Sequence, residues 1–246
     1  MKIKFLPLLP LFTLVFFSSQ AQEYGGYYFG AKGGLLLGTQ SWNNFERDPL
    51  VKYHGIAFIE SLDDTGQFSL FAQAGFHRKG SAIRGRNFIN LSNGETFRPS
   101  AQEFIFNNLA LTLGGKKRNW LSAFSTWHYM FGLRGDYTIS TNLDEYKALN
   151  EANGGLFFPA NAFVRKINYG VTLGGGVEFE LNELVGALIE FTVNPDFSLQ
   201  YRQPSIPNVY NPYTQTNSTI GERTIRNITF EVTAGFRFLR KVEYID

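Results

Sequence analysis

Alternation of apolar and polar residues is the most regular feature of this chain, and it is longest in Thr224–Lys241. Every second residue there is apolar and the residues between are polar or glycine; the apolar set is Ile228, Phe230, Val232, Ala234, Phe236 and Phe238. A period of two is typical of a β-strand, whose successive side chains point to opposite faces. A membrane-crossing strand needs about 9–11 residues, whereas strands of soluble proteins are usually about 5–6 residues long. The length of this segment therefore favours a strand that crosses a membrane.

Seven further segments have strand character, and they complete a set of eight: Tyr27–Gln40, Val51–Leu62, Gln67–Lys79, Glu103–Gly114, Ser125–Ser140, Phe163–Glu180 and Val185–Tyr201. The alternation is only partial in the second of them, and an irregular start at Asn107-Asn108 predicts a β-bulge in the fourth. Gly115–Asn119 has the composition of a compact basic turn.

The connections between these segments alternate in length. Those after the second, fourth and sixth strands are short, whereas the segments 80–102, 141–162 and 202–223 each exceed twenty residues. Transmembrane barrels have short turns on one side of the membrane and long loops on the other. The sequence therefore predicts an all-β fold, an eight-stranded antiparallel up-and-down transmembrane β-barrel that occupies residues 22–246.

The N-terminal 21 residues have the pattern of a secretory signal peptide. Lys2 and Lys4 precede the apolar stretch Phe5–Phe17, and Ser19 and Ala21 supply the small residues of a cleavage site. The stretch is shorter than the roughly 20 residues that a membrane helix requires. We expect export through this segment and a location in the cell outer membrane.

Composition adds two constraints. The chain has no cysteine, which excludes a disulfide framework and a thiolate metal site, and its net charge of +2 gives no sign of a nucleic-acid partner. Aromatic residues make up 16% of the chain, which aromatic girdles at the two membrane interfaces would explain.

The polar face of the strands decides between a membrane barrel and a soluble one. A soluble barrel would bury the apolar face and expose the charges to water. The membrane interpretation, which we favour, places the charges in a lumen just wide enough for side chains to fill. They would then form a structural network of ion pairs, for which the candidates are Lys32, Arg134, Asp136, Glu178, Glu190, Glu231 and Arg237, with His77 and Glu180 on the same face.

Catalytic and metal chemistry have no sequence support. No histidine is followed by a serine two residues on, because His54 precedes Gly55-Ile56, His77 precedes Arg78-Lys79, and His128 precedes Tyr129-Met130. The histidines also lack the spacing of a metal site. We therefore expect no catalytic residues, no metal, no cofactor and no identifiable small-molecule substrate.

The long loops are the better candidates for a function. Arg78, Lys79, Arg84 and Arg86 form a basic cluster that could contact lipopolysaccharide phosphates or a partner protein, or could simply be solvated. Phe157–Pro159 could contact a partner or fold over the barrel mouth.

The strands FGAKGGLLLG, YGVTLGGGVEFEL and ITFEVTAGFRF resemble those of the PorT-like outer-membrane β-barrel proteins of Bacteroidota. The resemblance covers the mature chain and implies an eight-stranded outer-membrane barrel without known catalytic residues; some relatives serve a secretion system. The leading hypothesis is a non-enzymatic barrel that supports the envelope or a membrane complex through its loops. Outer-membrane lipid, lipopolysaccharide and other envelope proteins are its candidate partners. A small pore, a lipid-modifying enzyme and a soluble ligand-binding barrel remain alternatives.

Overall fold

The computed structural model describes residues 24–43, 46–62, 67–85, 88–89, 96–97, 100–152, 158–211 and 214–243. The predicted signal peptide, residues 1–21, lies outside this part of the chain, as do Arg86 and Phe157.

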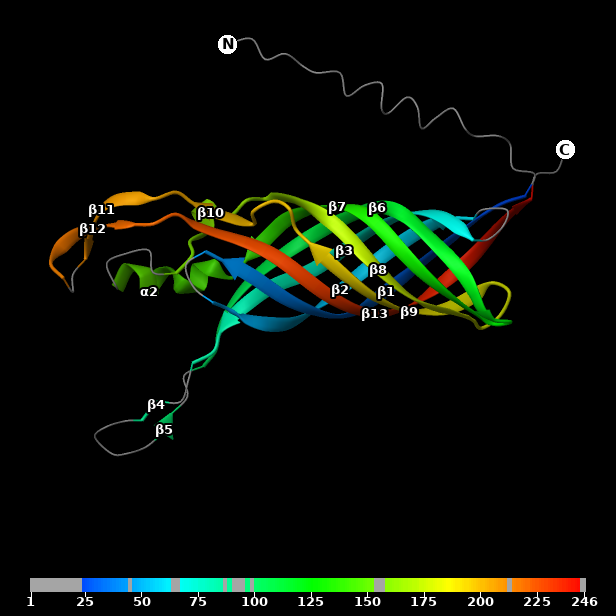
Figure 1. Ribbon diagram of the computed structural model, residues 1–246, viewed down its shortest axis with the longest axis horizontal. Helices are drawn as coiled ribbons and strands as arrows, with labels where there is room; N and C mark the ends of the chain where they lie inside the picture. The colour runs from blue at the N-terminus through cyan, green and yellow to red at the C-terminus, as the bar shows by residue number, and fades with distance from the viewer. Residues whose placement is uncertain are drawn as a thin grey trace, which may run out of the picture.

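Eight long strands form the wall of a barrel (Figure 1). They are β1 (Tyr24–Trp42), β2 (Asp48–Ser61), β3 (Phe68–Ile83), β6 (Gln102–Ser122), β7 (Ser125–Thr141), β8 (Ile167–Glu180), β9 (Val185–Pro195) and β13 (Arg223–Glu243). Each is antiparallel to its neighbour in this order, and β13 pairs with β1 from Tyr24↔Glu243 to Trp42↔Ile225. The ring is therefore closed, and the predicted eight-stranded antiparallel barrel is confirmed.

The predicted basic turn at Gly115–Asn119 is wrong, because β6 continues through it to Ser122. Lys116 and Arg118 point into the barrel and Lys117 points out, so the segment keeps the alternation of a strand. Charges that looked like turn residues are tolerated in the strand because the opposite wall supplies carboxylates for them.

Two other boundaries bear on the predictions. The register of β6 against β7 shifts between Asn107 and Asn108, as predicted, but the extra residue, Ile139, lies in β7 and not in β6. The strand predicted for Val185–Tyr201 ends earlier, at Pro195, whose nitrogen has no hydrogen to donate to a ladder. The chain then bends, and Tyr201–Gln203 forms a separate strand, β10, beside β13.

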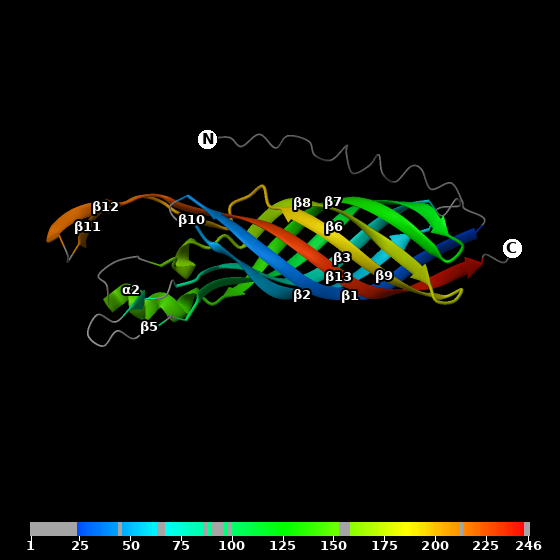
Figure 2. The same cartoon turned by 60° about the horizontal axis from the view of Figure 1, so that its bottom comes forward.

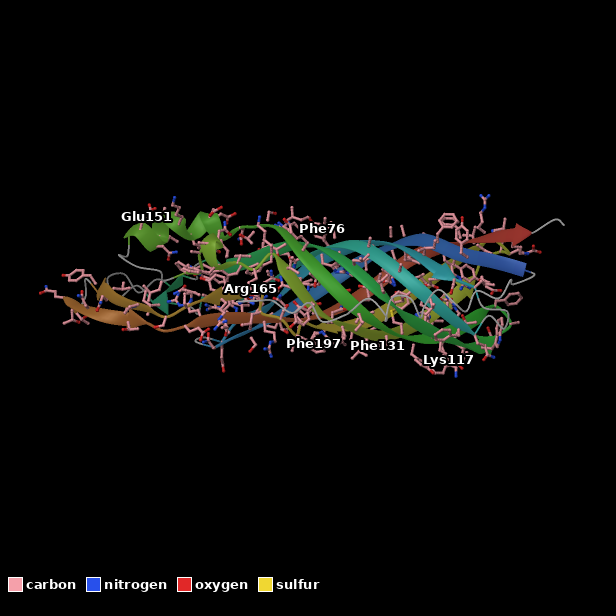
Figure 3. The ribbon with its side chains drawn as sticks, turned by 90° about the horizontal axis from the view of Figure 1, so that it is seen from above. Phe76, Lys117, Phe131, Glu151, Arg165 and Phe197 are labelled. Atoms are coloured by element: carbon pink, nitrogen blue, oxygen red, sulfur yellow. The ribbon has the colours of Figure 1, made fainter. Side chains whose placement is uncertain are left out.

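The outer surface of the barrel is apolar and its interior is polar. Residues of β7 alternate between exposed and buried along almost the whole strand, with Phe131 and Leu133 outside and Arg134 and Asp136 inside. Figure 3 shows Phe76, Phe131 and Phe197 on the outside of the wall. This is the reverse of a soluble barrel, which buries its apolar face, and it is the arrangement that a lipid environment requires.

Beyond the long-connection end of the barrel, the chain builds a small head (Figures 1 and 2). It contains the helical segments η1 (Leu143–Tyr146), α2 (Lys147–Ala152) and η2 (Asn161–Phe163), together with β10 and the two-stranded hairpin of β11 (Ile206–Asn211) and β12 (Thr216–Ile220). A second, short ribbon pairs β4 (Phe88–Ile89) with β5 (Thr96–Phe97). Among the described residues, no helix is long and apolar enough to cross a membrane.

The head has its own hydrophobic core, which lies over the barrel mouth. Side chains from β1, β6, β10 and β13 meet those of η1 and the segment before η2; the buried members are Trp42, Phe104, Phe106, Leu143, Tyr146, Phe158, Tyr201 and Ile225. Phe158 packs within this core, which agrees with one of the two alternatives for its segment, a loop that folds over the mouth. The head is therefore continuous with the barrel strands.

The apolar belt can be tested at Val232, which faces outward with apolar residues on both sides along β13. Val232→Arg would place a guanidinium in the hydrocarbon region, and we expect it to lower the free energy of unfolding by about 2–4 kcal/mol. Urea titration of the barrel in lipid vesicles measures this change. Asn217→Arg, in the exposed hairpin, is the control and should change stability by less than about 0.5 kcal/mol. Equal stability of the two variants would show that Val232 does not face lipid.

Candidate functional site

The lumen of the barrel is packed with side chains. At mid-height it contains a void of about 10 Å³, lined by groups such as Lys32, His77, Arg134 and Glu231. A cavity needs roughly 10–15 Å³ to hold one water molecule. The described lumen therefore has no room at this level for a continuous file of water.

The layer nearest the short turns is centred on Lys116, which comes from the stretch that the sequence predicts as a turn. Its Nζ lies 2.5 Å from Glu60, 3.2 Å from Glu178 and 3.1 Å from Glu190, three carboxylates from three different strands. Arg118, two residues on, pairs with Glu178 at 2.8 Å and also with Glu60. These five residues tie β6 to β2, β8 and β9 across the lumen.

Two further cations complete this layer. Lys32 pairs with Glu190, and Arg237 pairs with Glu178. A side chain at Gly235 would collide with Lys32, so glycine at that position leaves room for the lysine. The guanidinium of Arg237 lies 4.5 Å from the centre of the Tyr28 ring. This contact covers the end of the charge network with an aromatic side chain.

The middle layer contains two stacked histidines. Nδ1 of His77 lies 2.9 Å from Glu231, and Arg134 lies 3.6 Å from the same carboxylate. The ring of His54 stacks on His77 at 5.4 Å, and its Nε2 lies 2.9 Å from the hydroxyl of Thr233. The hydroxyl and the carboxylate therefore contact different histidines. These residues therefore do not form the hydroxyl–histidine–carboxylate chain of a hydrolase, in which one histidine contacts both other groups.

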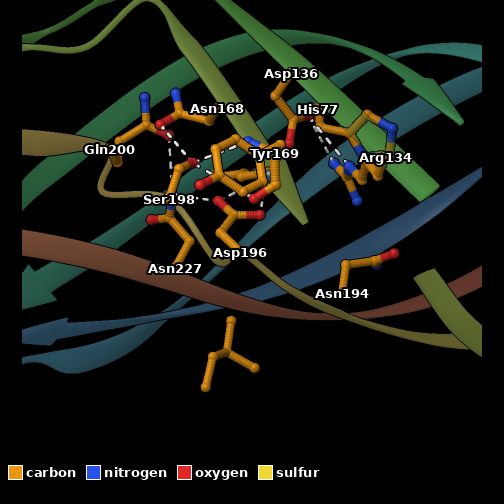
Figure 4. Close-up of polar contacts among 12 residues, drawn as sticks. His77, Arg134, Asp136, Asn168, Tyr169, Asn194, Asp196, Ser198, Gln200 and Asn227 are labelled. Atoms are coloured by element: carbon orange, nitrogen blue, oxygen red, sulfur yellow. Dashed lines mark hydrogen bonds and ion pairs between the residues drawn. The ribbon is translucent and has the colours of Figure 1, made fainter. Parts of the chain in front are cut away.

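The layer nearest the long loops joins charges to amides (Figure 4). Lys79 donates to Asp136 at 2.9 Å and to Asp196 at 3.2 Å. Asn227 donates to Asp196 and to Gln200, both at 2.9 Å. The polar network thus continues up to the hydrophobic core of the head.

Buried charge in the described residues is balanced. Six cations and six anions are buried; the cations are Lys32, Lys79, Lys116, Arg118, Arg134 and Arg237, and the anions are Glu60, Asp136, Glu178, Glu190, Asp196 and Glu231. An unpaired ion is costly in a low-dielectric interior, so this equality allows the charges to remain inside the wall.

All seven residues predicted for the interior network lie inside and form ion pairs. The prediction of the network lacked five buried charges that also form ion pairs in the lumen: Glu60, Lys79, Lys116, Arg118 and Asp196. Their signal was available only in part: Glu60 stands in the strand whose faces are unclear in the sequence, and Lys116 and Arg118 stand in the supposed turn. Glu180 lies at the barrel end and remains 43% exposed.

The predicted loop cluster is not a single surface. The prediction that Lys79 is a loop contact is wrong, because Lys79 is fully buried and paired with Asp136 and Asp196. Arg78, its neighbour in β3, points the other way and lies over the ring of Tyr53 on the outside of the barrel. Arg84 donates to the backbone carbonyl of Pro49. Alternation along β3 therefore separates Lys79 from Arg78, and Arg84 lies just beyond the end of that strand.

One group in the described lumen has the residue types of a metal site. Ligand atoms of His128, Glu178 and Glu190 lie within 4.8 Å of one another. The ammonium of Lys116, however, lies within 3.2 Å of both carboxylates. This lysine supplies the positive charge that a metal ion would bring, so the arrangement is that of an ion-pair network.

Burial in the head changes the ionisation of its polar side chains. Desolvation raises the pKa of Tyr146, whose hydroxyl donates to the carbonyl of Glu103 at 2.7 Å, with nearby Glu145 and Glu103 adding to the rise. Burial and then the positive charge of Arg223 lower the pKa of Arg47 to about 10. At neutral pH Arg47 keeps its charge, which lies 4.0 Å from the ring of Trp42. These contacts fix the first loop to the head.

A closed ring of eight antiparallel strands with an apolar outside and a charged, filled inside defines a transmembrane β-barrel of the outer-membrane type. No protein-family model and no curated protein sequence matches the chain. The assignment to the PorT-like family therefore stays a prediction.

Several solved structures are similar to this chain. Neisserial surface protein A has 10% sequence identity over 88% of this chain and 99% of its own, with a TM-score of 0.48. OprG from Pseudomonas aeruginosa has 10% identity over 88% of this chain and 97% of its own, with a TM-score of 0.46. Ail, the attachment invasion locus protein of Yersinia pestis, solved with the heparin analogue sucrose octasulfate, has 9% identity over 87% of this chain and 99% of its own, with a TM-score of 0.38. None of these likenesses assigns a role, and the fold described above rests on the strand pairing itself.

The charge network can be tested at Glu178, which pairs with Lys116, Arg118 and Arg237. Glu178→Gln would leave three buried cations short of one carboxylate, and we expect the free energy of unfolding to fall by about 3–5 kcal/mol. Urea unfolding in vesicles, followed by tryptophan fluorescence, gives the value. Glu183→Gln, in the exposed turn between β8 and β9, is the matched control and should be nearly neutral. A neutral Glu178→Gln variant would mean that the lumen is hydrated and that the charges are not paired.

Proposed function

We propose that this protein is a non-enzymatic, non-conducting barrel of the outer membrane that holds its extracellular head for a partner of the cell envelope. The observation that carries the proposal is the contrast between the two parts. The lumen is filled by balanced ion pairs and closed by the core of the head. The outer part of the head, in contrast, is exposed and can contact another protein. A barrel of this kind anchors the head in the membrane and presents it to a partner, while the interior ion pairs stabilise the fold.

The shape of the head supports a protein partner. The hairpin of β11 and β12 extends away from the barrel (Figure 2). Within the described residues its two strands pair only with each other, so both outer edges keep free backbone groups. Such an edge can accept an added strand from another chain. This surface fits a role in supporting the envelope or a membrane complex, including a complex used in secretion. A PorT-like assignment agrees with that role and is part of the proposal.

The filled lumen predicts an absence of conductance. Purified barrel in planar lipid bilayers should give no stepwise current under voltages at which an open porin, measured alongside, conducts. Folding of the barrel in the same sample is verified independently by heat-modifiable migration. Reproducible conductance steps would overturn the proposal and favour a small pore.

The head can be tested by removing the hairpin. Ile206 pairs with Ile220, so the chain ends left by deleting 206–220 lie side by side and two glycines can join them. We expect this variant to form a heat-modifiable barrel, because the hairpin lies outside the ring. Recovery of envelope proteins after cross-linking in cells should fall at least about fivefold, because the deletion removes the strand edges that would bind the partner.

The control for this deletion is Glu183→Gln, at the opposite end of the barrel, which should leave recovery unchanged. Unchanged recovery from the deletion variant would remove the hairpin from the partner surface. Mass spectrometry of lipid A from a deletion strain tests the enzyme alternative, and an altered acylation pattern restored by the intact gene would contradict the non-enzymatic role.

A further inference from the structure

Three segments lie side by side where the barrel meets the head. Val164, before β8, forms a bridge with Tyr201 of β10, and Tyr201 pairs with Ile225 of β13. Tyr201 and Ile225 are buried in the head core, and Val164 packs against it. This row of three residues therefore points inward.

Each residue of this row is followed by an arginine: Arg165, Arg202 and Arg226. Successive side chains of extended segments point to opposite faces, so an inward row places the next residues outward. All three arginines are exposed. Because neighbouring strands lie about 4.8 Å apart, the three backbone positions fall within about 10 Å of one another. We call these residues the arginine trio.

Positive charge on the trio is only partly neutralised. Arg202 pairs with Glu222 at 2.8 Å, and both side chains are about half exposed. Within the described residues, no ion pair joins Arg165 or Arg226 to a carboxylate. Lys166 adds a further exposed cation beside Arg165. The surface therefore has an excess of positive charge that an anion can neutralise.

An exposed apolar surface begins directly below the trio, on the barrel wall. Ile167 is 75% exposed, Tyr169 is 59% exposed and Phe197 is 56% exposed. Ile167 and Tyr169 share the exposed face of β8, and the amide of Phe197 donates to the carbonyl of Tyr169 at 2.9 Å, so the three residues are neighbours. Figure 3 shows Arg165 and Phe197 towards the same end of the barrel. Cations and apolar groups thus follow one another along the membrane normal.

We infer that the arginine trio binds the phosphate group of an anionic lipid in the outer leaflet, while the acyl chains of that lipid lie on Ile167, Tyr169 and Phe197. Guanidinium groups form strong, charge-assisted hydrogen bonds with phosphate oxygens. A free phosphate ion would use the arginines alone, whereas a lipid also covers the apolar patch. The inference rests on the outer-membrane placement proposed above. It moves the phosphate contact away from Arg78, Lys79, Arg84 and Arg86, where the sequence suggested it.

Native mass spectrometry of the refolded chain in detergent tests this inference. The probes are phosphatidylglycerol, phosphatidylcholine with the same acyl chains, and inorganic phosphate. The variant Arg165→Gln/Arg202→Gln/Arg226→Gln removes the trio. The matched control, Lys117→Gln/Lys147→Gln/Arg240→Gln, removes the same charge from exposed positions elsewhere.

We expect the native chain to bind phosphatidylglycerol at least about tenfold more tightly than phosphatidylcholine, since each cation near a membrane surface contributes measurably to anionic-lipid affinity. The trio variant should lose that preference, and the control should retain it within about twofold. Inorganic phosphate should not displace the lipid.

Equal losses in the two triple variants would overturn the inference, because they would show general charge attraction in place of a site. Displacement by inorganic phosphate at matched concentration would overturn the lipid assignment. Heat-modifiable migration and insertion into vesicles are measured on every sample. Failure to insert would contradict the outer-membrane proposal, whereas insertion without lipid preference would contradict only the present inference.

Discussion

The requirement that every backbone polar group be paired within lipid is the constraint on which this structure depends. The pairing of β1 with β13 meets it, because the first and last barrel strands would otherwise present open edges to the membrane. Closure of eight strands then fixes the diameter of the lumen, which is just wide enough for side chains. Side chains must therefore fill the interior, and the charges among them must be balanced.

The buried charges of the lumen are balanced in number. With six buried cations facing six buried anions, the described lumen can exclude bulk water without leaving an ion unpaired. Lys116 shows how the pairing works, since it contacts carboxylates from β2, β8 and β9 at once. Such contacts cross the barrel, so they fix the wall from within. In the function proposed above, the two outer surfaces, the head and the lipid-facing wall, are the places where this protein acts.

The head and the wall meet at the row of Val164, Tyr201 and Ile225. One face of that row closes the hydrophobic core above the lumen, and the following residues form the arginine trio on the other face. The same strand alternation that separates lipid from lumen in the barrel thus separates core from surface at its rim. A protein partner at the hairpin and a lipid at the trio would contact different residues of the head and rim.

The sequence by itself determined the number of barrel strands, the alternating faces of all but the second of them and the seven interior charges, because a period of two is a local property of the chain. It also located the register shift at Asn107-Asn108, although the extra residue lies in the neighbouring strand. It could not determine that Gly115–Asn119 continues a strand, since turn-like charges become strand residues only when carboxylates from other strands stand opposite. It grouped Lys79 with Arg78, although the tertiary structure places them on opposite sides of the wall. The arginine trio is spread over sixty-two positions, from Arg165 to Arg226, and only the pairing of distant segments brings it together.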